Sequence, residues 1–369
     1  MNNSRKSLIG KALVGLGVSL TTIVFTQTNP VSALVDCAPT TGTAGEWDYA
    51  EFTNVGSCRF TLPDNAYQVN VMVVAGGGAG GWSDEDSAAG GGAGGVAAGL
   101  VVMSGELTIT VGAGGIGHQD RPATPSADGE DSSIVSNQGL VVAHGGAHGS
   151  GWGESLPSSG GSGSGAHATY TQAGTGTGGT TNNPDSIINF YGNDGGAGTD
   201  GTGGGGGGAT SAGGNGSAGV GGNGGGGIGH TLFGYGFNDT YAVGGGGCGN
   251  VSNGFGGGSC VDNGPGGSAA PNSGSGGGGS YNDASGSGGS GYVFIMWQIS
   301  QPTTTSGDTS TTLDETTTSG PTETSTSANE NPDVLVATGS SGPNTALMAV
   351  ALFILGAALT VLVRRPQHR

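Results

Sequence analysis

Four cysteines offer the clearest chemistry in this chain. The spacing of Cys37 with Cys58, and of Cys248 with Cys260, predicts two local disulfide bonds. Three pairings are formally possible. Because no two of the cysteines have the close spacing of a zinc knuckle, a zinc site is the weaker alternative. Closing the shorter loop would stabilise the fold by about 3 kcal/mol, which matters most where the hydrophobic core is thin.

Two histidines and two acidic clusters are the candidates for binding a metal ion. His144 and His148 are four residues apart, a spacing that suits metal binding on a helix, but the glycines at 145 and 146 disfavour a helix there. The acidic runs Asp84-Glu85-Asp86 and Glu130-Asp131 could attract calcium. Solvated turns between strands are the favoured interpretation of both runs, so we predict no metal site.

Catalytic chemistry is not indicated by any spacing in the sequence. No Ser–His–Asp or Cys–His arrangement can be argued, and no pair of carboxylates stands out as suited to glycoside hydrolysis. Gly-x-Gly-x-x-Gly patterns recur, but without the βαβ context that would make them a nucleotide site. We therefore expect a protein that is not an enzyme and that carries no cofactor.

Aromatic side chains interrupt the glycine tracts, and they allow two interpretations. They can cap packed glycine segments, which is the favoured role, or they can form a contact surface for sugars or proteins. These aromatic residues are Trp82, Trp152, Tyr170, Phe190, Tyr191, Phe233, Tyr235, Phe237 and Tyr241.

Glycine dominates the region that these residues share. Of 87 glycines in 369 residues, 76 lie between positions 76 and 291. Such a region is either a disordered spacer or a structure held by backbone hydrogen bonds between closely packed chains. Ordered tracts would resemble polyproline II, with three residues per turn. The candidate inner segments are residues 203–208, 224–227, 244–247 and 276–279, whereas the Ser/Gly tract 158–165 is expected to be disordered.

Short β-strands begin and end the glycine region, which favours order, since a free linker has no need of them. The predicted strands are residues 47–52, 57–62, 68–75, 134–135, 140–142 and 292–297. In 68–75 the odd-numbered valines should share one face. Residues 97–103 and 106–111 are predicted to form a hairpin through Ser104-Gly105. The predicted fold class is an all-β sandwich from which packed glycine tracts project.

Both ends of the chain have the pattern of targeting segments. Basic residues, an apolar run at 12–25 and Val31-Ser32-Ala33 indicate a signal peptide, residues 1–33, with an uncleaved anchor as the alternative. The glycine-rich domain would span 36–300.

A stalk rich in Ser and Thr follows at 301–334. The apolar segment 345–363 is predicted to be a transmembrane helix, with the arginine-containing tail 364–369 in the cytoplasm.

The segment between these ends is strongly acidic. It holds all 26 Asp and Glu residues and two basic residues, Arg59 and Arg121, so its formal charge is 2 − 26 = −24. A nucleic-acid partner is therefore excluded, because there is no basic surface to neutralise phosphate.

Several strand and glycine phrases resemble a known family. Residues 69–81 (VNVMVVAGGGAGG), 105–115 (GELTITVGAGG), 128–133 (DGEDSS) and 288–295 (GGSGYVFI) are similar to landmarks of the glycine-rich domain of bacterial surface and phage tail-fibre proteins. The glycine-rich module of anaplastic lymphoma kinase receptors has the same order of elements. The resemblance covers about residues 57–298. It implies a TNF-like, jelly-roll β-sandwich bearing bundled polyglycine-II helices, with a role in binding or display.

A second resemblance lies near the C-terminus. Leu335-Val336-Ala337-Thr338-Gly339, followed by the apolar segment and arginines, resembles a variant LPxTG-like sortase signal in which Val336 replaces proline. The resemblance implies cleavage after Thr338 and linkage of Thr338 to peptidoglycan, with retention by the membrane span as the alternative.

Together these features predict an exported protein of the bacterial cell membrane or cell wall. Its glycine-rich domain would be extracellular and would serve display, adhesion or binding of a protein or glycan ligand. A structural coat or spacer without a specific ligand is the alternative, and an extracellular hydrolase is a remote one.

Overall fold

A computed structural model describes residues 34–84, 87–118, 125–151, 156–170, 172–199, 201–229, 239–249, 254–261 and 264–299. All of them belong to one compact unit that extends to Thr303. The predictions for the signal peptide, stalk, sorting signal, transmembrane helix and basic tail fall outside the described residues. Within the described ranges the fold is all-β, and no helix there could cross a membrane.

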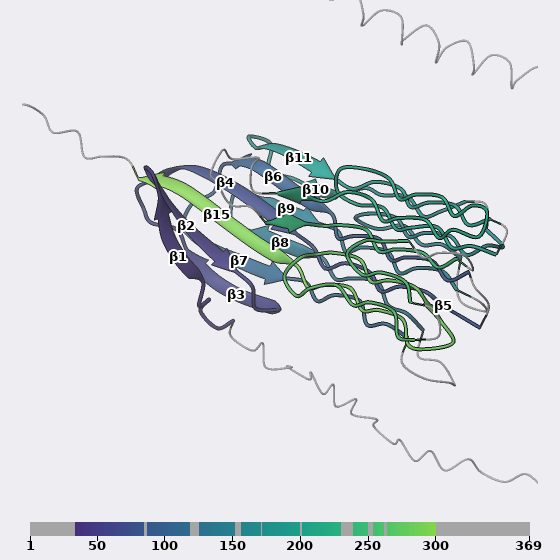
Figure 1. Ribbon diagram of the computed structural model, residues 1–369. Helices are drawn as coiled ribbons and strands as arrows, with labels where there is room; N and C mark the ends of the chain where they lie inside the picture. Colours follow the sequence, from purple (N-terminus) through teal and green to yellow (C-terminus); the bar gives the residue numbers. More distant parts are fainter. Residues whose placement is uncertain are drawn as a thin grey trace, which may run out of the picture. The chain divides into compact units, whose positions relative to one another are not determined.

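Six strands form the larger sheet (Figure 1). In spatial order they are β1 (Thr40–Ala44), β2 (Trp47–Phe52), β15 (Tyr292–Ile299), β4 (Ala66–Val74), β6 (Val96–Val101) and β11 (Ile187–Tyr191). All neighbours pair antiparallel. The strand that ends the glycine region, β15, thus lies centrally between β2 and β4, which come from the beginning of the chain.

Five strands form the second sheet, in the order β10 (Gly179–Thr181), β9 (Leu140–Ala143), β8 (Ser132–Val135), β7 (Glu106–Val111) and β3 (Gly56–Thr61). Two short pairs lie outside both sheets. They are β12 (Ile228–Gly229) with β13 (Thr240–Tyr241), and β5 (Trp82–Ser83) with β14 (Ser280–Tyr281).

The alternation of side chains along β4 shows how the sequence builds the core between the sheets. Val69, Val71 and Val73 point into the cluster that contains residues from both sheets, as predicted for the odd-numbered valines. Met72 and Val74 lie on the opposite face of the sheet, in a second buried cluster. Because successive side chains of a strand alternate between faces, one apolar strand supplies both clusters.

The predicted strands are present, but one predicted pairing is wrong. The segments 97–103 and 106–111 do not form a hairpin, since β6 pairs with β4 and β11 whereas β7 pairs with β3 and β8. The chain instead crosses from one sheet to the other through Gly105, whose φ of 71° is in the left-handed region. The residues Ser104 and Gly105 suit a hairpin turn. The two strands instead lie in different sheets, so that Val101 and Leu107 are buried in the same core between them.

Glycine tracts project from one end of the sandwich and run side by side (Figure 1). Their hydrogen bonds repeat every third residue. The N–H groups of residues 76 and 79 donate to residues 130 and 127, those of 77 and 80 donate to 289 and 286, and those of 78 and 81 donate to 92 and 89. Three residues per turn with bonds directed sideways is the polyglycine form of a polyproline-II helix. The tract 76–81 therefore bonds to three neighbours in turn.

The inner tracts are packed too closely for side chains. A Cβ added at Gly206 would lie 1.9 Å from the carbonyl oxygen of Gly91, and one at Gly80 would lie 1.9 Å from that of Gly278. Residues 203–208, 244–247 and 276–279 are buried, as predicted. Residues 224–227 are only partly so.

The tract 158–165 corrects an expectation of disorder. Residues 161–165 are buried in the bundle, where Ser162 N–H donates to Ala93 O at 3.0 Å and Gly165 N–H donates to Gly90 O at 3.0 Å. Small residues other than glycine are also accommodated inside the bundle, since Ala79, Ala93 and Ala147 are fully buried. The physical reason is the threefold repeat, because only some of the positions on a tract face a neighbour at its closest approach.

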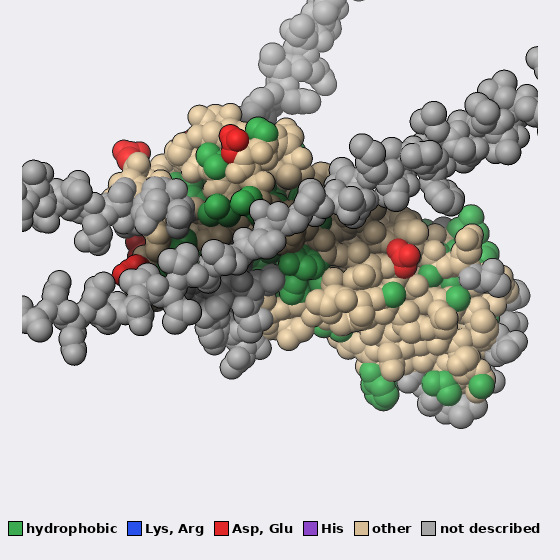
Figure 2. Space-filling view, turned by 90° about the horizontal axis from the view of Figure 1, so that it is seen from above, with side chains coloured by type: hydrophobic (Ala, Val, Ile, Leu, Met, Phe, Trp, Pro, Cys, Tyr) green, Lys and Arg blue, Asp and Glu red, His purple; other side chains and the backbone are tan. Residues whose placement is uncertain are grey.

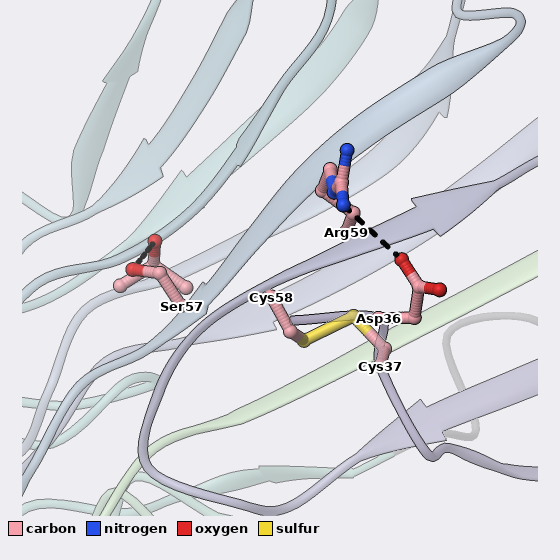
Figure 3. The surroundings of a disulfide bond; sticks show 6 residues. Asp36, Cys37, Ser57, Cys58 and Arg59 are labelled. Carbon is pink, nitrogen blue, oxygen red and sulfur yellow. Dashed lines mark hydrogen bonds and ion pairs between the residues drawn. A yellow bond between two sulfur atoms is a disulfide. The ribbon is translucent and has the colours of Figure 1, made fainter. Parts of the chain in front are cut away.

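The free edge of β3 is covered by the segment that precedes β1 (Figure 3). Cys37 N–H donates to Arg59 O at 2.8 Å, Arg59 N–H donates to Val35 O at 2.9 Å, and Cys37 is joined to Cys58. Covering an edge strand blocks pairing with other chains. The ion pair between Arg59 and Asp36, 3.6 Å apart, is exposed and adds little stability.

Candidate binding surface at the tip of the glycine bundle

The far end of the bundle is a set of short turns and the pair β5–β14 (Figure 1). Thr199 with Thr202, and Ser217 with Val220, close two of these turns through reciprocal backbone hydrogen bonds. Each turn joins an outgoing tract to a returning one. Among the described residues, this tip is the part of the bundle most distant from the sandwich (Figure 1).

Both predicted cysteine pairs are at disulfide distance. Cys37 is joined to Cys58 beside the sandwich, and Cys248 is joined to Cys260 within the bundle. Cys248 and Cys260 are buried in a small cluster with Ala88. The second disulfide therefore links two tracts where side-chain packing is sparse, which is where a covalent link contributes most relative to the local core.

His144 and His148 lie along one edge of the bundle rather than on a helix. The Nδ1 atoms of His144 and His148 are 3.3 Å and 2.6 Å from carboxylate oxygens of Asp131 and Asp128 respectively. Within the described ranges, no three or more His, Cys, Asp or Glu side chains form a group that could hold a metal ion. Glu85 and Asp86 lie outside the described residues.

The two aspartates also complete the hydrogen bonding of the bundle edge. Asp131 Oδ1 accepts from Gly145 N–H at 2.8 Å, and Asp128 Oδ1 accepts from His148 N–H at 2.7 Å. Both the acceptors and the donors are three residues apart, in register with the polyglycine repeat. Burial raises the pKa of Asp128, but hydrogen bonds from the side chain and backbone of His148 outweigh it and the pKa is lowered. Carboxylates thus replace the carbonyl groups of a missing neighbouring tract.

Asparagines have the same capping role elsewhere on the bundle. Asn215 Oδ1 accepts from Ala197 N–H at 2.8 Å, and Asn223 Oδ1 accepts from Phe255 N–H at 2.8 Å. Sequence reasoning missed this role. The signal that could have revealed it is the recurrence of single Asn or Asp residues inside glycine tracts.

The described residues of the predicted aromatic set contact other side chains, and three of them, Phe190, Tyr191 and Tyr241, belong to the clusters of the sandwich. Trp82 stacks on His118 with ring centroids 4.9 Å apart, and Tyr241 stacks on Tyr292 at the same distance. Phe190 and Tyr191 pack against the two core clusters. Trp152, Phe233, Tyr235 and Phe237 lie outside the described residues.

The Tyr241–Tyr292 pair is buried on the outer face of the six-stranded sheet, beside the carboxyl groups of Glu51 and Asp239. Burial raises the pKa of Tyr241 to about 12, with a further contribution from Asp239. Burial also raises the pKa of Glu51, although a hydrogen bond from Tyr292 opposes the shift. These groups hold the β12–β13 pair against the sheet, so they have a structural role.

Tyr170 is different, because it lines a pocket of about 340 Å³. The lining residues are Leu156, Pro157, Thr169, Tyr170, Gln172 and Ala173. Leu156 is 67% exposed, so its apolar side chain is accessible to a ligand. A volume above about 300 Å³ is within the range of sites for small ligands.

A buried histidine holds the turn that carries Tyr170. His167 is 2% exposed, and its backbone N–H donates to Ser150 Oγ at 2.6 Å. Tyr170 N–H donates to His167 O at 2.8 Å, which closes the turn. Since Thr169 N–H donates to His167 Nδ1 at 3.3 Å, that nitrogen carries no proton and Nε2–H donates to Ser87 Oγ at 2.5 Å. Burial lowers the pKa of His167, which favours the neutral form of the ring.

Neither Ser–His contact has the geometry of a catalytic pair. The nucleophile must donate its proton to a histidine nitrogen, while a carboxylate holds the other ring nitrogen. At His167 the direction is reversed, because Nε2–H donates to Ser87. At His148 the carboxylate of Asp128 and the hydroxyl of Ser158 both contact Nδ1, at 2.6 Å and 3.3 Å.

One face of the molecule shows little charge and few large side chains. Figure 2 shows one face on which backbone and small polar groups prevail, with scattered apolar side chains and isolated acidic ones. Arg59, on the sandwich, is the one Lys or Arg among the described residues. Phe255, which is 72% exposed, was missed by sequence reasoning, and its place in a glycine tract gave no sign that it would face solvent.

The architecture defines a class of protein: an all-β sandwich with a projecting bundle of polyglycine tracts. The family model of the glycine-rich domain matches residues 53–298, and the chain belongs to that family. A search of curated proteins finds no match to this chain. The family match spans both the sandwich and the bundle.

Proposed function

We propose that this protein is an exported bacterial surface protein that displays the tip of its glycine bundle for adhesion or ligand binding, without catalysing a reaction. In this proposal a signal peptide directs export and the C-terminal segment anchors the chain. The anchor is the apolar segment 345–363, or peptidoglycan linked through Thr338. The proposal also assigns the sandwich to the TNF-like, jelly-roll type that the resemblance implies.

The observation that carries the proposal is the direction in which β15 runs. This strand begins at Tyr292, directly after the bundle, and ends at Ile299, at the other end of the sandwich (Figure 1). Eight residues in a strand cover about 26 Å. The chain therefore leaves the sandwich toward its C-terminal segments on the side opposite the bundle. An anchor beyond residue 299 would leave the tip at the free end.

Two further features support display rather than catalysis. The Ser–His contacts at His148 and His167 lack the geometry of a nucleophile and its base. Most of the bundle is backbone, which supplies a rigid spacer but few reactive groups. The same rigidity supports the alternative of a spacer without a ligand, which predicts that no exposed side chain at the tip affects binding.

Size-dependent labelling of intact producing cells tests display. Ser217→Cys places a thiol in a tip turn, and Asp64→Cys places one in the turn between β3 and β4 at the opposite end of the sandwich; both positions are exposed. We expect a large polyethylene-glycol maleimide to label the tip variant, while the other variant reacts only with a small maleimide. If both thiols react only after the cells are lysed, the proposed export is wrong. If the large reagent labels the Asp64→Cys variant and not the Ser217→Cys variant, the proposed orientation is wrong.

A further inference from the structure

We infer that the pocket beside Tyr170 binds the ring of a neutral sugar. This inference rests on the proposed function, because it names the ligand class that the displayed tip would recognise. It stands on the chemistry of the pocket, the charge of its surroundings and the rigidity of the turn that carries Tyr170.

The pocket combines an aromatic ring with aliphatic walls. Tyr170 supplies the aromatic ring, and Leu156, Pro157 and Ala173 supply apolar surface. A sugar ring presents C–H groups on its faces and hydroxyl groups around its rim. An aromatic side chain with a polar end suits such a ligand, since it offers an apolar face and a hydrogen-bonding edge.

Two polar side chains in the lining can form hydrogen bonds with the hydroxyl groups around a sugar ring. The Oγ1 atom of Thr169 is 3.1 Å from His167 Nδ1. Because Nδ1 is an acceptor, the threonine hydroxyl donates to it and keeps its oxygen lone pairs for an incoming hydroxyl group. The amide of Gln172, an exposed lining residue, can both donate and accept. Sugar hydroxyls need both kinds of partner.

The uncharged lining and the acidic chain around it favour a neutral ligand. Among the lining residues that the structure describes, none is acidic or basic. The chain has 26 acidic residues against 8 basic ones, so its field repels anionic ligands such as phosphates and acidic sugars. A cationic ligand would need a carboxylate in the lining, and the described lining residues supply none.

The turn is held in place before any ligand binds. Buried His167 bonds to Ser87, Ser150 and Thr169, which come from two other segments and from the turn itself. A pre-organised site loses less conformational entropy on binding, which suits a small ligand with few contacts.

Glycan binding by cells that display the full chain tests the inference. The probes are fluorescent polymers carrying glucose, galactose, mannose or N-acetylglucosamine, with a sialic-acid polymer and a proline-rich peptide polymer for comparison. An epitope inserted after Ala33 measures display. We expect at least one neutral probe to bind, Tyr170→Ala to weaken its binding about tenfold, and Tyr170→Phe to retain it, because the ring remains.

Matched variants keep the test sharp. Phe255→Ala removes an exposed aromatic side chain outside the pocket and should leave binding unchanged. Gln172→Ala removes an exposed polar group and should weaken binding without affecting folding, so it tests the site even if Tyr170→Ala is poorly displayed. Binding that falls equally in the Phe255 and Tyr170 variants would overturn the inference, as would preference for the peptide or for sialic acid.

The outcomes separate this inference from the proposed function. If the large maleimide reaches the tip but no neutral probe binds, even at millimolar sugar concentration, the sugar site is wrong and display stands. If the tip is not reached on intact cells, the proposed function fails, and the same probes are then applied to purified full-length chain. Binding of a neutral probe that Tyr170→Ala weakens would support the pocket in that case, and no binding would overturn it.

Discussion

The sandwich and the glycine bundle are held together in opposite ways. In the sandwich, side chains alternate with a period of two and fill the space between sheets, as Val69, Val71 and Val73 do on β4. In the bundle, backbone groups bond with a period of three, and the closest approaches exclude side chains altogether. The comparison shows that one chain can be held together by buried apolar side chains in one region and by hydrogen bonds between closely packed glycine backbones in another.

The largest expected effect comes from adding one carbon to the bundle. Gly206→Ala would bring its Cβ 1.9 Å from Gly91 O, whereas Gly214→Ala has no neighbour closer than Asn223 N at 3.1 Å. We expect the first change to lower the free energy of unfolding by more than about 4 kcal/mol and the second by less than about 1 kcal/mol. Denaturant unfolding measures both. Equal effects would mean that the tracts are not closely packed.

Truncating a buried side chain should destabilise the sandwich more than the bundle. Ile109 is fully buried between the sheets, so Ile109→Ala is expected to lower the free energy of unfolding by about 3 to 4 kcal/mol. Ala147 is fully buried in the bundle, and Ala147→Gly should have an effect of about 0.5 to 1 kcal/mol. Thermal or denaturant unfolding compares the two variants, and a larger loss at Ala147 would contradict the distinction.

The edge of the bundle should depend on an acceptor rather than on a charge. Asp131→Ala leaves Gly145 N–H without its acceptor and should lower the free energy of unfolding by about 1 kcal/mol. Asp131→Asn keeps an oxygen at that place and should have a smaller effect. If the two variants lose the same stability, the carboxylate acts through its charge and the capping role is wrong.

The smallest effect is a pH dependence located at the tip. Burial lowers the pKa of His167 from its usual 6.5, so the unfolded chain holds the proton more tightly. The stability from neutral His167 is therefore complete above about pH 6.5 and is lost as the pH falls toward the folded pKa. The free energy of unfolding should fall between pH 7.5 and pH 5, and we expect His167→Gln to make this fall smaller by less than about 1 kcal/mol. Melting temperatures measured at the two pH values test this. An unchanged decline would exclude His167 as its source.

The sandwich could be predicted from the sequence to a large extent, because its strands carry side-chain patterns. The valines of β4 and the two cysteine pairs are examples. The predicted hairpin at residues 97–111 failed because turn chemistry is local, whereas pairing between sheets depends on distant strands.

The bundle was harder to predict, because glycine gives no sign of which neighbour it faces. Composition predicted the polyglycine form, but not that residues 161–165 would be buried within it. The site at Tyr170 was predicted only as one of several aromatic residues. Its supporting histidine, His167, was missed because its partners Ser87 and Ser150 lie far away in the sequence.

Amide hydrogen exchange on the intact exported chain tests the central claim most directly. The N–H groups of residues 203–207 donate to other backbone segments, and that of Gly208 donates to Ser211 O within the following turn; the amides of β4 donate within the sheet. If backbone bonding holds the bundle together, these glycine amides will exchange slowly, within about tenfold of the amides of β4. Exchange at the rate of an unstructured peptide in residues 203–208, while β4 stays protected, would contradict the account.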